Sequence, residues 1–298
     1  MDEGVKQRYI EAGEAIQAAR EHAREVAEPG TSFVEIAESI EKVVRENGCE
    51  PAFPVNLSAN EEAAHYTPPP DGDRVLSEDD VLKIDIGAHS DGYIADTALT
   101  VNPSGKHREV VDAVEEVLQE ALDFIEPGVT VEEFGSFVQK QVPDEYQVVR
   151  NLTGHYLGRY TQHAGVSIPN VDNGSQHDFQ QGDAVAIEPF ITAGSGKVKD
   201  GAKGNIYRLE RDGNVRGRQA RKILGDIKEF QGLPFTTRWL DDFSGRDKMA
   251  MKRLVDSGIV HSYPVLKEVE DGLVAQAEHT VLVGADGGEN VGGRRYGE

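Results

Sequence analysis

The chain has 298 residues, enough for one large or two moderate domains, and 53 acidic against 31 basic residues give a formal net charge of −22 at pH 7. This charge argues against nucleic acid or an anionic membrane as the main partner. It favours a protein adapted to the high intracellular salt of an extreme halophile over an ordinary acidic cytosolic protein. The single cysteine, Cys49, excludes an intrachain disulfide and a thiolate metal cluster.

The chain begins with a predicted pair of helices. Apolar residues at helical spacing predict a helix over residues 5–27, which Glu-Pro-Gly at 28–30 stops. Ser32 and Glu35, three residues apart, form a capping-box signature for a second helix over 33–47.

The same pattern recurs further along the chain. A helix is predicted over residues 107–125, Glu-Pro-Gly stops it at 126–128, and Thr130 with Glu133 caps a further helix through about residue 141. The two stops lie 98 positions apart. Matching caps and helices on both sides of the stops favour an internal duplication over a coincidence of common breakers.

Strands are predicted between and after the helix pairs. Val81–Gly87 and Tyr93–Val101 flank a polar loop and are typical of a hairpin. In the second half, Ala184–Phe190 and Val274–Val283 are strand-like. Each of these strands carries an acidic residue among apolar neighbours, which makes the four segments candidates for a functional site.

The acidic residues of the hairpin are Asp85 and Asp96. A two-residue turn at Ser90-Asp91 places them directly opposite each other, where Cβ atoms lie about 4.5–5.5 Å apart and like charges are destabilising. Such a pair is stabilised by a cation between the carboxylates or by one shared proton. The alternative is that one aspartate faces solvent and the other accepts hydrogen bonds in a turn.

Three further residues are candidates for the same site. A carboxylate inside an apolar strand, such as that of Glu188 or Glu278, is costly unless an arginine or a metal ion compensates it. His155 follows a glycine, a setting more typical of a packed or exposed histidine than of a ligand. Together with the two aspartates, these residues form a hard, oxygen-rich set that suits Mn, Fe, Co or Zn in pairs. Two such metals, about 3.5–4 Å apart, activate water and polarise a carbonyl.

Short motifs in the chain resemble, in their order, those of the methionine aminopeptidases. They are Lys83–Gly87, Ile94–Thr97, Thr153–His155, Ile187–Phe190 and Gln276–Thr280. Phe53–Ser58, Ala63–Pro68 and a basic insertion before Tyr263 are similar to the type II branch. The chain lacks the charged N-terminal extension of the eukaryotic enzymes and so resembles the compact archaeal form.

The resemblance implies the pita-bread (creatinase/aminopeptidase) fold, an α/β arrangement of two pseudo-symmetric halves around a central antiparallel sheet. The inferred duplication agrees with it. Residues 1–196 and 263–298 are then expected to form the catalytic domain. Residues 197–262, with 15 basic and 9 acidic residues and helical stretches near 218–229 and 245–256, are expected to form an inserted helical, winged-helix-like subdomain.

The resemblance also implies a metal centre. Two divalent metal ions (Co, Mn, Fe or Zn) would be bound by four carboxylates and one imidazole, those of Asp85, Asp96, His155, Glu188 and Glu278. Within this set, Asp85 would bind one metal through both oxygens, and Asp96 and Glu278 would bridge the two ions. His155 and Glu188 would complete the other site.

The remaining implied roles concern the substrate. Glu188 would carry the proton from water to the leaving amine, and His65 and His163 would contact the substrate carbonyl and stabilise the tetrahedral intermediate. Phe53 and Tyr263 would line the pocket for the methionine side chain. Gln162 departs from the family, in which an isoleucine often precedes the second histidine, so the shape of this pocket stays open.

The implied activity is removal of the initiator methionine from nascent proteins, with preference for a small second residue, by two-metal-activated attack of water on the first peptide bond. The partners are therefore nascent polypeptide N-termini. The basic insertion either contacts ribosomal RNA or is a solvated face. Because the chain shows no signal peptide and no run of about 18 apolar residues, we expect a cytoplasmic monomer without a membrane partner.

Two alternatives from the same residues remain. Xaa-Pro aminopeptidases and prolidases share the five ligands, but they usually carry a large N-terminal domain, for which the segment before His65 leaves no room. A catalytically inactive relative that binds RNA or the ribosome would have lost ligands, whereas all five are present in this chain.

Overall fold

The two predicted helix pairs flank a central sheet in the computed structural model, which describes residues 1–291. Each pair turns at a Glu-Pro-Gly stop whose glycine is left-handed, with φ of +95° at Gly30 and +94° at Gly128, a conformation that glycine adopts without steric cost. The repeat predicted from the sequence therefore recurs in the backbone. The bounds of the helices are α1 (Glu3–Val26), α2 (Phe33–Glu46), α3 (Arg108–Phe124) and α4 (Val131–Gln141).

Side chains cap the second helix of each pair. At α4, Thr130 Oγ1 accepts a hydrogen bond from the Glu133 N–H, and the Glu133 carboxylate accepts one from the Thr130 N–H, so both arms of the capping box are formed. At α2, the described hydrogen bonds include only the first arm, from the Glu35 N–H to Ser32 Oγ at 3.1 Å. These caps are local interactions, which explains why the sequence located both helix starts.

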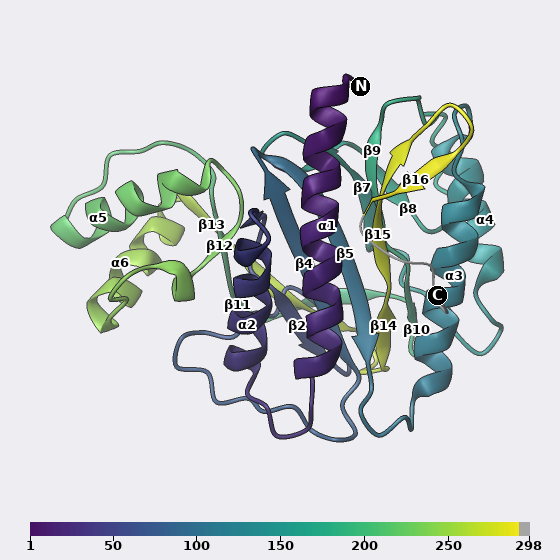
Figure 1. Cartoon of the computed structure of the whole chain (residues 1–298). Helices are drawn as coiled ribbons and strands as arrows, with labels where there is room; N and C mark the ends of the chain where they lie inside the picture. Colours follow the sequence, from purple (N-terminus) through teal and green to yellow (C-terminus); the bar gives the residue numbers. More distant parts are fainter. Residues whose placement is uncertain (292–298) are drawn as a thin grey trace.

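The central sheet is antiparallel and has nine strands (Figure 1). Seven follow the spatial order β1-β4-β5-β15-β9-β7-β8, while β2 pairs with β4 and β16 pairs with β15. The two repeats thus meet in the middle of one sheet, where β5 lies beside β15. The bounds are β1 (Glu50–Pro51), β2 (Asn56–Ala59), β4 (Leu82–Ser90), β5 (Tyr93–Val101), β7 (Thr153–Gly158), β8 (Thr161–Pro169), β9 (Ala184–Ile187), β15 (Glu278–Val283) and β16 (Gly288–Asn290).

Two smaller sheets adjoin the central one. One has three strands in the order β14-β10-β6, and the other has four in the order β12-β11-β13-β3. The long pair β11–β13 connects the predicted insertion to β3 in the first repeat. The bounds are β3 (Glu62–Ala64), β6 (Gln147–Val148), β10 (Phe190–Thr192), β11 (Val198–Leu209), β12 (Phe235–Thr236), β13 (Val260–Glu268) and β14 (Val274–Gln276).

The β4–β5 hairpin forms in a register different from the predicted one. Its turn residues are Asp91 and Gly92, with φ of +49° and +86°, one position later than predicted. An Asp-Gly pair suits a tight hairpin turn because both central residues need a positive φ. Asp96 consequently pairs with Gly87 and not with Asp85. The prediction that the two aspartates are directly opposed was wrong: they are diagonal neighbours on one face of the sheet.

The two strands predicted in the second half are each interrupted. β9 and β10 are separated by Glu188-Pro189, and β14 and β15 are separated by Ala277. Proline has no N–H with which to continue a ladder, which accounts for the first break. In both cases one piece belongs to the central sheet and the other to the three-stranded sheet.

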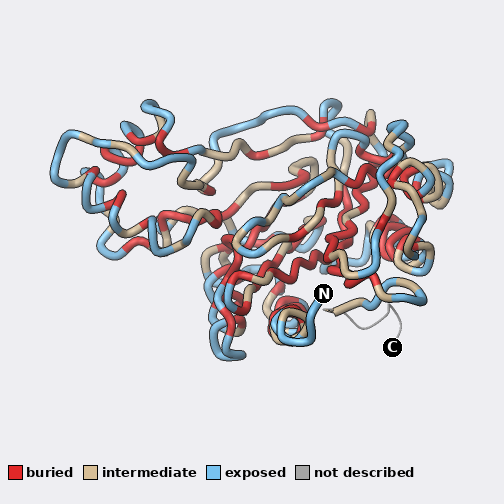
Figure 2. The backbone as a smooth tube through the Cα atoms, turned by 90° about the horizontal axis from the view of Figure 1, so that it is seen from above, coloured by how far each residue is buried: buried red, intermediate tan, exposed pale blue. Residues whose placement is uncertain are grey.

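Two apolar cores fill the space between the helices and the central sheet. Figure 2 shows which stretches of the backbone are buried. The first packs α1 and α2 against β2, β4 and β5 through residues such as Ile16, Ile40 and Ile84. The second packs α3 and α4 against β9, β14 and β15, with Phe134 and Val281 among its members. One core per repeat agrees with the pita-bread architecture. Within residues 1–291, no helix combines the length and the apolar character that a membrane span needs.

The segment predicted as an insertion has a third apolar core of its own. Leu224, Leu254 and Phe235 are buried in it together with residues of α5, α6 and the strand ends. In Figure 1 these helices lie to one side of the central sheet. The helical elements of this segment are α5 (Arg218–Asp226), η1 (Ile227–Phe230), η2 (Thr237–Trp239) and α6 (Gly245–Asp256).

Candidate metal centre

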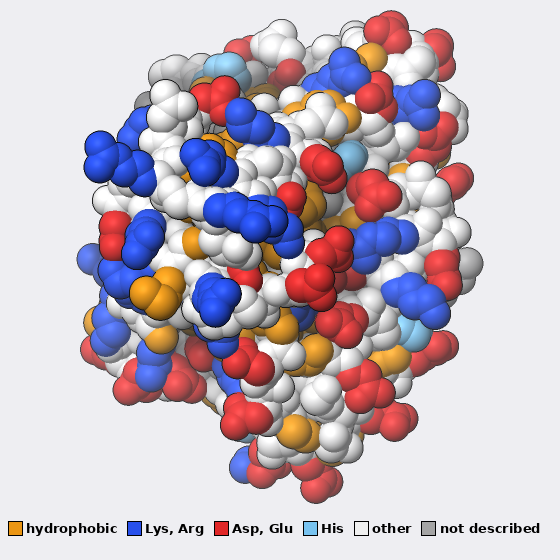
Figure 3. Space-filling model, turned by 90° about the vertical axis from the view of Figure 1, so that its left-hand side faces the viewer, with side chains coloured by type: hydrophobic (Ala, Val, Ile, Leu, Met, Phe, Trp, Pro, Cys, Tyr) orange, Lys and Arg blue, Asp and Glu red, His pale blue; other side chains and the backbone are white. Residues whose placement is uncertain are grey.

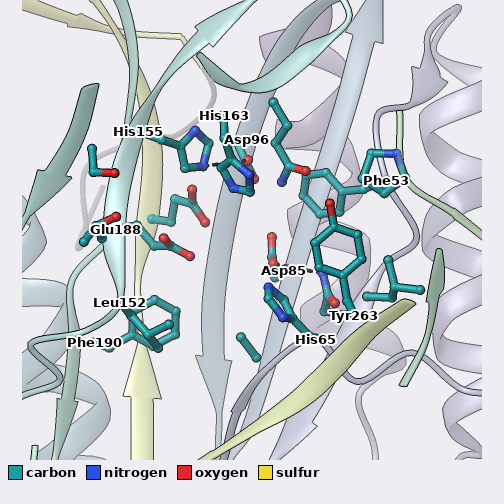
Figure 4. A pocket seen from close by; sticks show the side chains of 18 of the residues that line it. Phe53, His65, Asp85, Asp96, Leu152, His155, His163, Glu188, Phe190 and Tyr263 are labelled. Carbon is teal, nitrogen blue, oxygen red and sulfur yellow. Dashed lines mark hydrogen bonds and ion pairs between the residues drawn. The ribbon is translucent and has the colours of Figure 1, made fainter. Parts of the chain in front are cut away.

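The five predicted ligands come from five strands that are neighbours in the central sheet. In the spatial order β4, β5, β15, β9 and β7, each strand contributes one side chain, and Glu188 directly follows β9. Figure 4 shows that Asp85, Asp96, His155 and Glu188 point toward a common space. In that order, the ligands are Asp85, Asp96, Glu278, Glu188 and His155.

Asp96, His155 and Glu278 form the tightest part of the cluster. One potential ligand atom from each lies within 4.8 Å of the others, and His155 Nε2 is 3.7 Å from Asp96 Oδ2. Their exposed fractions are only 1%, 6% and 1%, respectively. The 3.7 Å between His155 Nε2 and Asp96 Oδ2 is too long for a direct hydrogen bond, but it matches two ligands around one ion with bonds of about 2.0–2.2 Å.

Burial disfavours charge on every carboxyl group of the cluster. It raises the pKa of Asp85 to about 7 and raises the pKa values of Asp96, Glu188 and Glu278 well above their usual range, with mutual repulsion adding to the shift of the last three. Burial also lowers the pKa of His155 to about 3, so its imidazole is in the neutral form that binds metals. Four buried carboxyl groups in one space call for cations.

Unpartnered polar atoms test whether metal ions fit this site. In the described part of the chain, Asp85 Oδ1, Asp96 Oδ1 and Glu278 Oε1 are buried and have no hydrogen-bond partner. Most buried polar atoms in proteins are satisfied, so this concentration of free lone pairs requires an explanation. A set of carboxylate oxygens and one imidazole suits a pair of divalent metal ions. The residues present therefore fit a two-metal site.

Amide side chains that the sequence interpretation did not assign to the site bind two of the predicted ligands. Asn56 Nδ2 donates to Asp85 Oδ2 at 3.0 Å, and Gln276 Nε2 donates to Glu188 Oε1 at 3.0 Å. Such outer contacts fix the orientation of metal ligands. A polar residue inside an apolar strand, as at Gln276, is a sequence signal that could have identified them.

His65 has an unusual backbone for its position beside the cluster. Its φ is +67°, a left-handed conformation that costs strain for a residue other than glycine and that recurs at functional sites. Its ring contacts the edge of Tyr263, with centroids 5.4 Å apart. Burial lowers the pKa of His65 to about 4, so this imidazole is neutral at physiological pH.

A cavity of about 420 Å³ opens onto the cluster. Phe53 and Tyr263 lie on one side of it in Figure 4, while Leu152 and Phe190 lie on the other. His163 is beside the ligands, its ring edge-on to that of His155 with centroids 4.4 Å apart. All nine site residues predicted from the sequence line this one cavity, as does Gln162.

Comparison with known proteins places this arrangement among the metallopeptidases. The model of metallopeptidase family M24 matches residues 7–285. A methionine aminopeptidase of Methanocaldococcus jannaschii is 43% identical over 95% of this chain and 97% of its own length, and one of Pyrococcus horikoshii is 45% identical over 94% and 96%. The crystal structure of a methionine aminopeptidase from Thermotoga maritima, 21% identical, superposes with a TM-score of 0.71 over 99% of this chain and 98% of that chain, and it supports the fold.

Proposed function

The chain belongs to metallopeptidase family M24, and from this membership and its ligand set we infer a metal-dependent methionine aminopeptidase that removes the N-terminal methionine from proteins. The observation that carries the conclusion is the convergence of five ligands from five adjacent strands on one cavity. Its substrates are the N-termini of nascent proteins. Divalent metal ions are its cofactors.

We propose that all five clustered side chains would hold two divalent ions. Asp96 and Glu278 are deeply buried near the centre of the ligand order, and each has a carboxylate oxygen without a hydrogen-bond partner among the described residues, so both would contribute to this binding. The ions, when bound, activate water and polarise the scissile carbonyl. The chain's own groups orient the peptide and move protons.

Glu188 is the proposed proton carrier. Gln276 binds one of its carboxylate oxygens at 3.0 Å, which holds the carboxylate in place at the cavity wall. From this position the Glu188 carboxylate can accept a proton from water and then deliver it to the leaving amine.

His65 and His163 are proposed to contact the scissile carbonyl. The neutral ring of His65 can donate one N–H hydrogen bond to an oxygen that gains negative charge, and donors preorganised in this way stabilise the tetrahedral intermediate. Phe53 and Tyr263 are proposed to line the methionine pocket. Gln162 lines the same cavity and places an amide where an apolar wall is expected, so it is a candidate for tuning the choice of the first side chain.

A peptide panel tests this function. With Co²⁺ or Mn²⁺ present, Met-Gly and Met-Ala peptides should lose their first residue at least about 100-fold faster than Met-Leu peptides, measured by chromatography of released methionine. The enzyme should not cleave N-acetylated Met-Ala peptides, which serve as controls. Preferential cleavage of Ala-Pro peptides would instead support the Xaa-Pro aminopeptidase alternative, and cleavage that survives EDTA would contradict metal dependence.

We also propose the domain division expected from the sequence, with residues 1–196 and 263–298 as the catalytic domain and 197–262 as the insertion; residues 292–298 lie outside the described part. The insertion's own apolar core supports this division. Because all five proposed ligands and the pocket residues belong to one chain, we propose that the enzyme acts as a monomer. We also propose that it acts in the cytoplasm, where its proposed substrates, nascent N-termini, arise.

The insertion is also the proposed ribosome contact. Figure 3 shows lysine and arginine side chains gathered over the part of the molecule that holds α5 and α6, in contrast to the chain's overall negative charge. Arg216, Arg218 and Arg221 are exposed there. A basic face of this kind attracts RNA phosphates, and it does so more strongly at low salt.

Charge reversal tests the ribosome proposal. The triple variant Arg216→Glu, Arg218→Glu and Arg221→Glu should co-sediment with ribosomes at least about tenfold less than the wild type at low salt, while its cleavage of a free Met-Ala peptide stays unchanged. A control variant should reverse three exposed charges on the side of the molecule opposite the insertion, and it should co-sediment like the wild type. Equal co-sedimentation of all three proteins would remove the proposal.

A further inference from the structure

The two halves of the central sheet meet between β5 and β15, and this seam separates two of the ligands, Asp96 and Glu278. Backbone pairing across the seam is limited to Glu278 with Ala98 and His279 with Thr97. The β4–β5 hairpin, by comparison, pairs along the full length of both strands. With so short a ladder at the seam, other groups must set the distance between the two ligands.

Threonine hydroxyls supply part of the connection across the seam. Thr280 Oγ1 accepts from the Asp96 N–H at 2.7 Å and donates to the Asp96 carbonyl oxygen at 2.9 Å. Thr97 Oγ1 donates to the Glu278 carbonyl oxygen at 2.8 Å. Thus the backbone of each ligand is bound by a hydroxyl from the strand on the other side.

Arg20 of α1 reaches the same seam from the helix side of the sheet. Its Nη1 donates to Thr97 Oγ1 and to the Ala98 carbonyl oxygen, both at 2.8 Å, and lies 3.4 Å from the Glu278 carbonyl oxygen. Only 5% of Arg20 is exposed. One guanidinium nitrogen therefore contacts both strands at the level where Asp96 and Glu278 leave the backbone.

A second buried group holds Arg20 in this position. Its Nη2 is 3.1 Å from Glu115 Oε1, and the two side chains are 6% and 4% exposed. Arg20 belongs to the first helix pair and Glu115, on α3, to the second, so the ion pair crosses the same junction in the helix layer. A buried ion pair repays its desolvation only with good geometry and further hydrogen bonds, which the seam provides.

We propose that Arg20, held by Glu115, is a positioning residue that sets the spacing of Asp96 and Glu278 across the seam. It lies behind the sheet and acts through the Glu278 carbonyl and the Thr97 hydroxyl. The inference rests on the proposed function, because the spacing matters if the two carboxylates share a pair of metal ions. Outer contacts of this kind typically change metal affinity 10–100-fold.

Matched arginine-to-lysine substitutions test the proposal in the full-length enzyme. Arg20→Lys keeps the charge but cannot reproduce the fork that binds Glu115 and the seam together. Compared with the wild type, we expect the more weakly bound of the two Co²⁺ ions to bind about tenfold less tightly and the visible spectrum of bound Co²⁺ to change. We also expect a lower kcat, with KM changed less than about twofold. The control is Arg238→Lys, the same change in a second buried Arg–Glu pair, whose hydrogen bonds reach Thr67 and Trp239 but none of the five proposed ligands.

The control should have a lower melting temperature but a wild-type Co²⁺ affinity and spectrum. If Arg20→Lys behaves in the same way, Arg20 only stabilises the fold and the proposal is overturned. Should Arg20→Lys fail to fold, Thr97→Val removes the bridging hydroxyl and is expected to change the same spectrum and affinity; an unchanged spectrum would again overturn the proposal. Failure of the wild type to cleave Met-Ala peptides would refute the function alone, because the Co²⁺ measurements need no substrate.

Discussion

Replacing Asp96 with asparagine is expected to lower kcat/KM at least about a thousandfold, which corresponds to about 4 kcal/mol of transition-state stabilisation. The same change should leave the metal-free protein at least as stable as the wild type. Asp96 is 1% exposed, and burial together with the Asp85 carboxylate raises its pKa well above the usual range, so its charge opposes folding when no cation compensates it. Asparagine has a similar shape and no charge.

Thermal unfolding with and without metal measures both effects. In EDTA, the variant should melt at or above the wild-type temperature. At a Co²⁺ concentration of about 100 times Kd, the wild type should gain about 2.7 kcal/mol for each ion bound, and Asp96→Asn should gain much less. Asp144→Asn, which neutralises an exposed carboxylate, should match the wild type in activity and in metal response. A variant that loses activity but binds two Co²⁺ ions normally would contradict the ligand role of Asp96.

Breaking the buried ion pair between Glu41 and Arg238 is expected to cost about 3–5 kcal/mol of folding free energy. Two guanidinium–carboxylate hydrogen bonds of 2.9 and 2.7 Å join them, and their side chains are 2% and 1% exposed. The Trp239 Nε1–H donates to the same carboxylate at 2.8 Å. Arg238→Met leaves this carboxylate charged and buried, and it removes both guanidinium hydrogen bonds between the insertion and Glu41 of α2.

Urea titration at equilibrium measures this loss. The double variant Glu41→Gln with Arg238→Met should recover part of the stability, because glutamine keeps an acceptor for Trp239 without a buried charge. Lys252→Met, which breaks an exposed pair with Asp256, is the control and should change stability by no more than about 0.5 kcal/mol. A loss of less than about 1 kcal/mol in Arg238→Met would show that the pair is well solvated.

The helices and their starts could be predicted because their signals are local. The Thr130–Glu133 capping box and the glycine of each Glu-Pro-Gly stop act over a few residues, and the structure places them as expected. The predicted register of the β4–β5 hairpin was wrong, because the turn lies one position later in the chain than predicted. The choice between Ser90-Asp91 and Asp91-Gly92 depends on which residues tolerate a positive φ, a signal that was present in Gly92.

Motifs were enough to propose the site residues, which line one cavity in the structure, but the contacts that orient them could not be predicted. Asn56 and Gln276 bind ligand carboxylates only because β2 and β14 lie beside β4 and near β9, which no short pattern encodes. Arg20 shows the same limit. It follows Ile16 by four residues on the apolar face of α1, an odd place for a charge, but its partner Glu115 lies in another helix.

By itself, the sequence determined the helix pairs, their caps, the internal repeat and the acidic residues that are costly inside apolar strands, because each depends on neighbours a few positions away. Only the tertiary structure decided the strand order that sets β15 between β5 and β9, the break at Ala277, and the contacts of Arg20 at the seam. The physical reason is that a carboxylate cluster is defined by distances between strands that are remote in the chain, and long-range packing sets those distances.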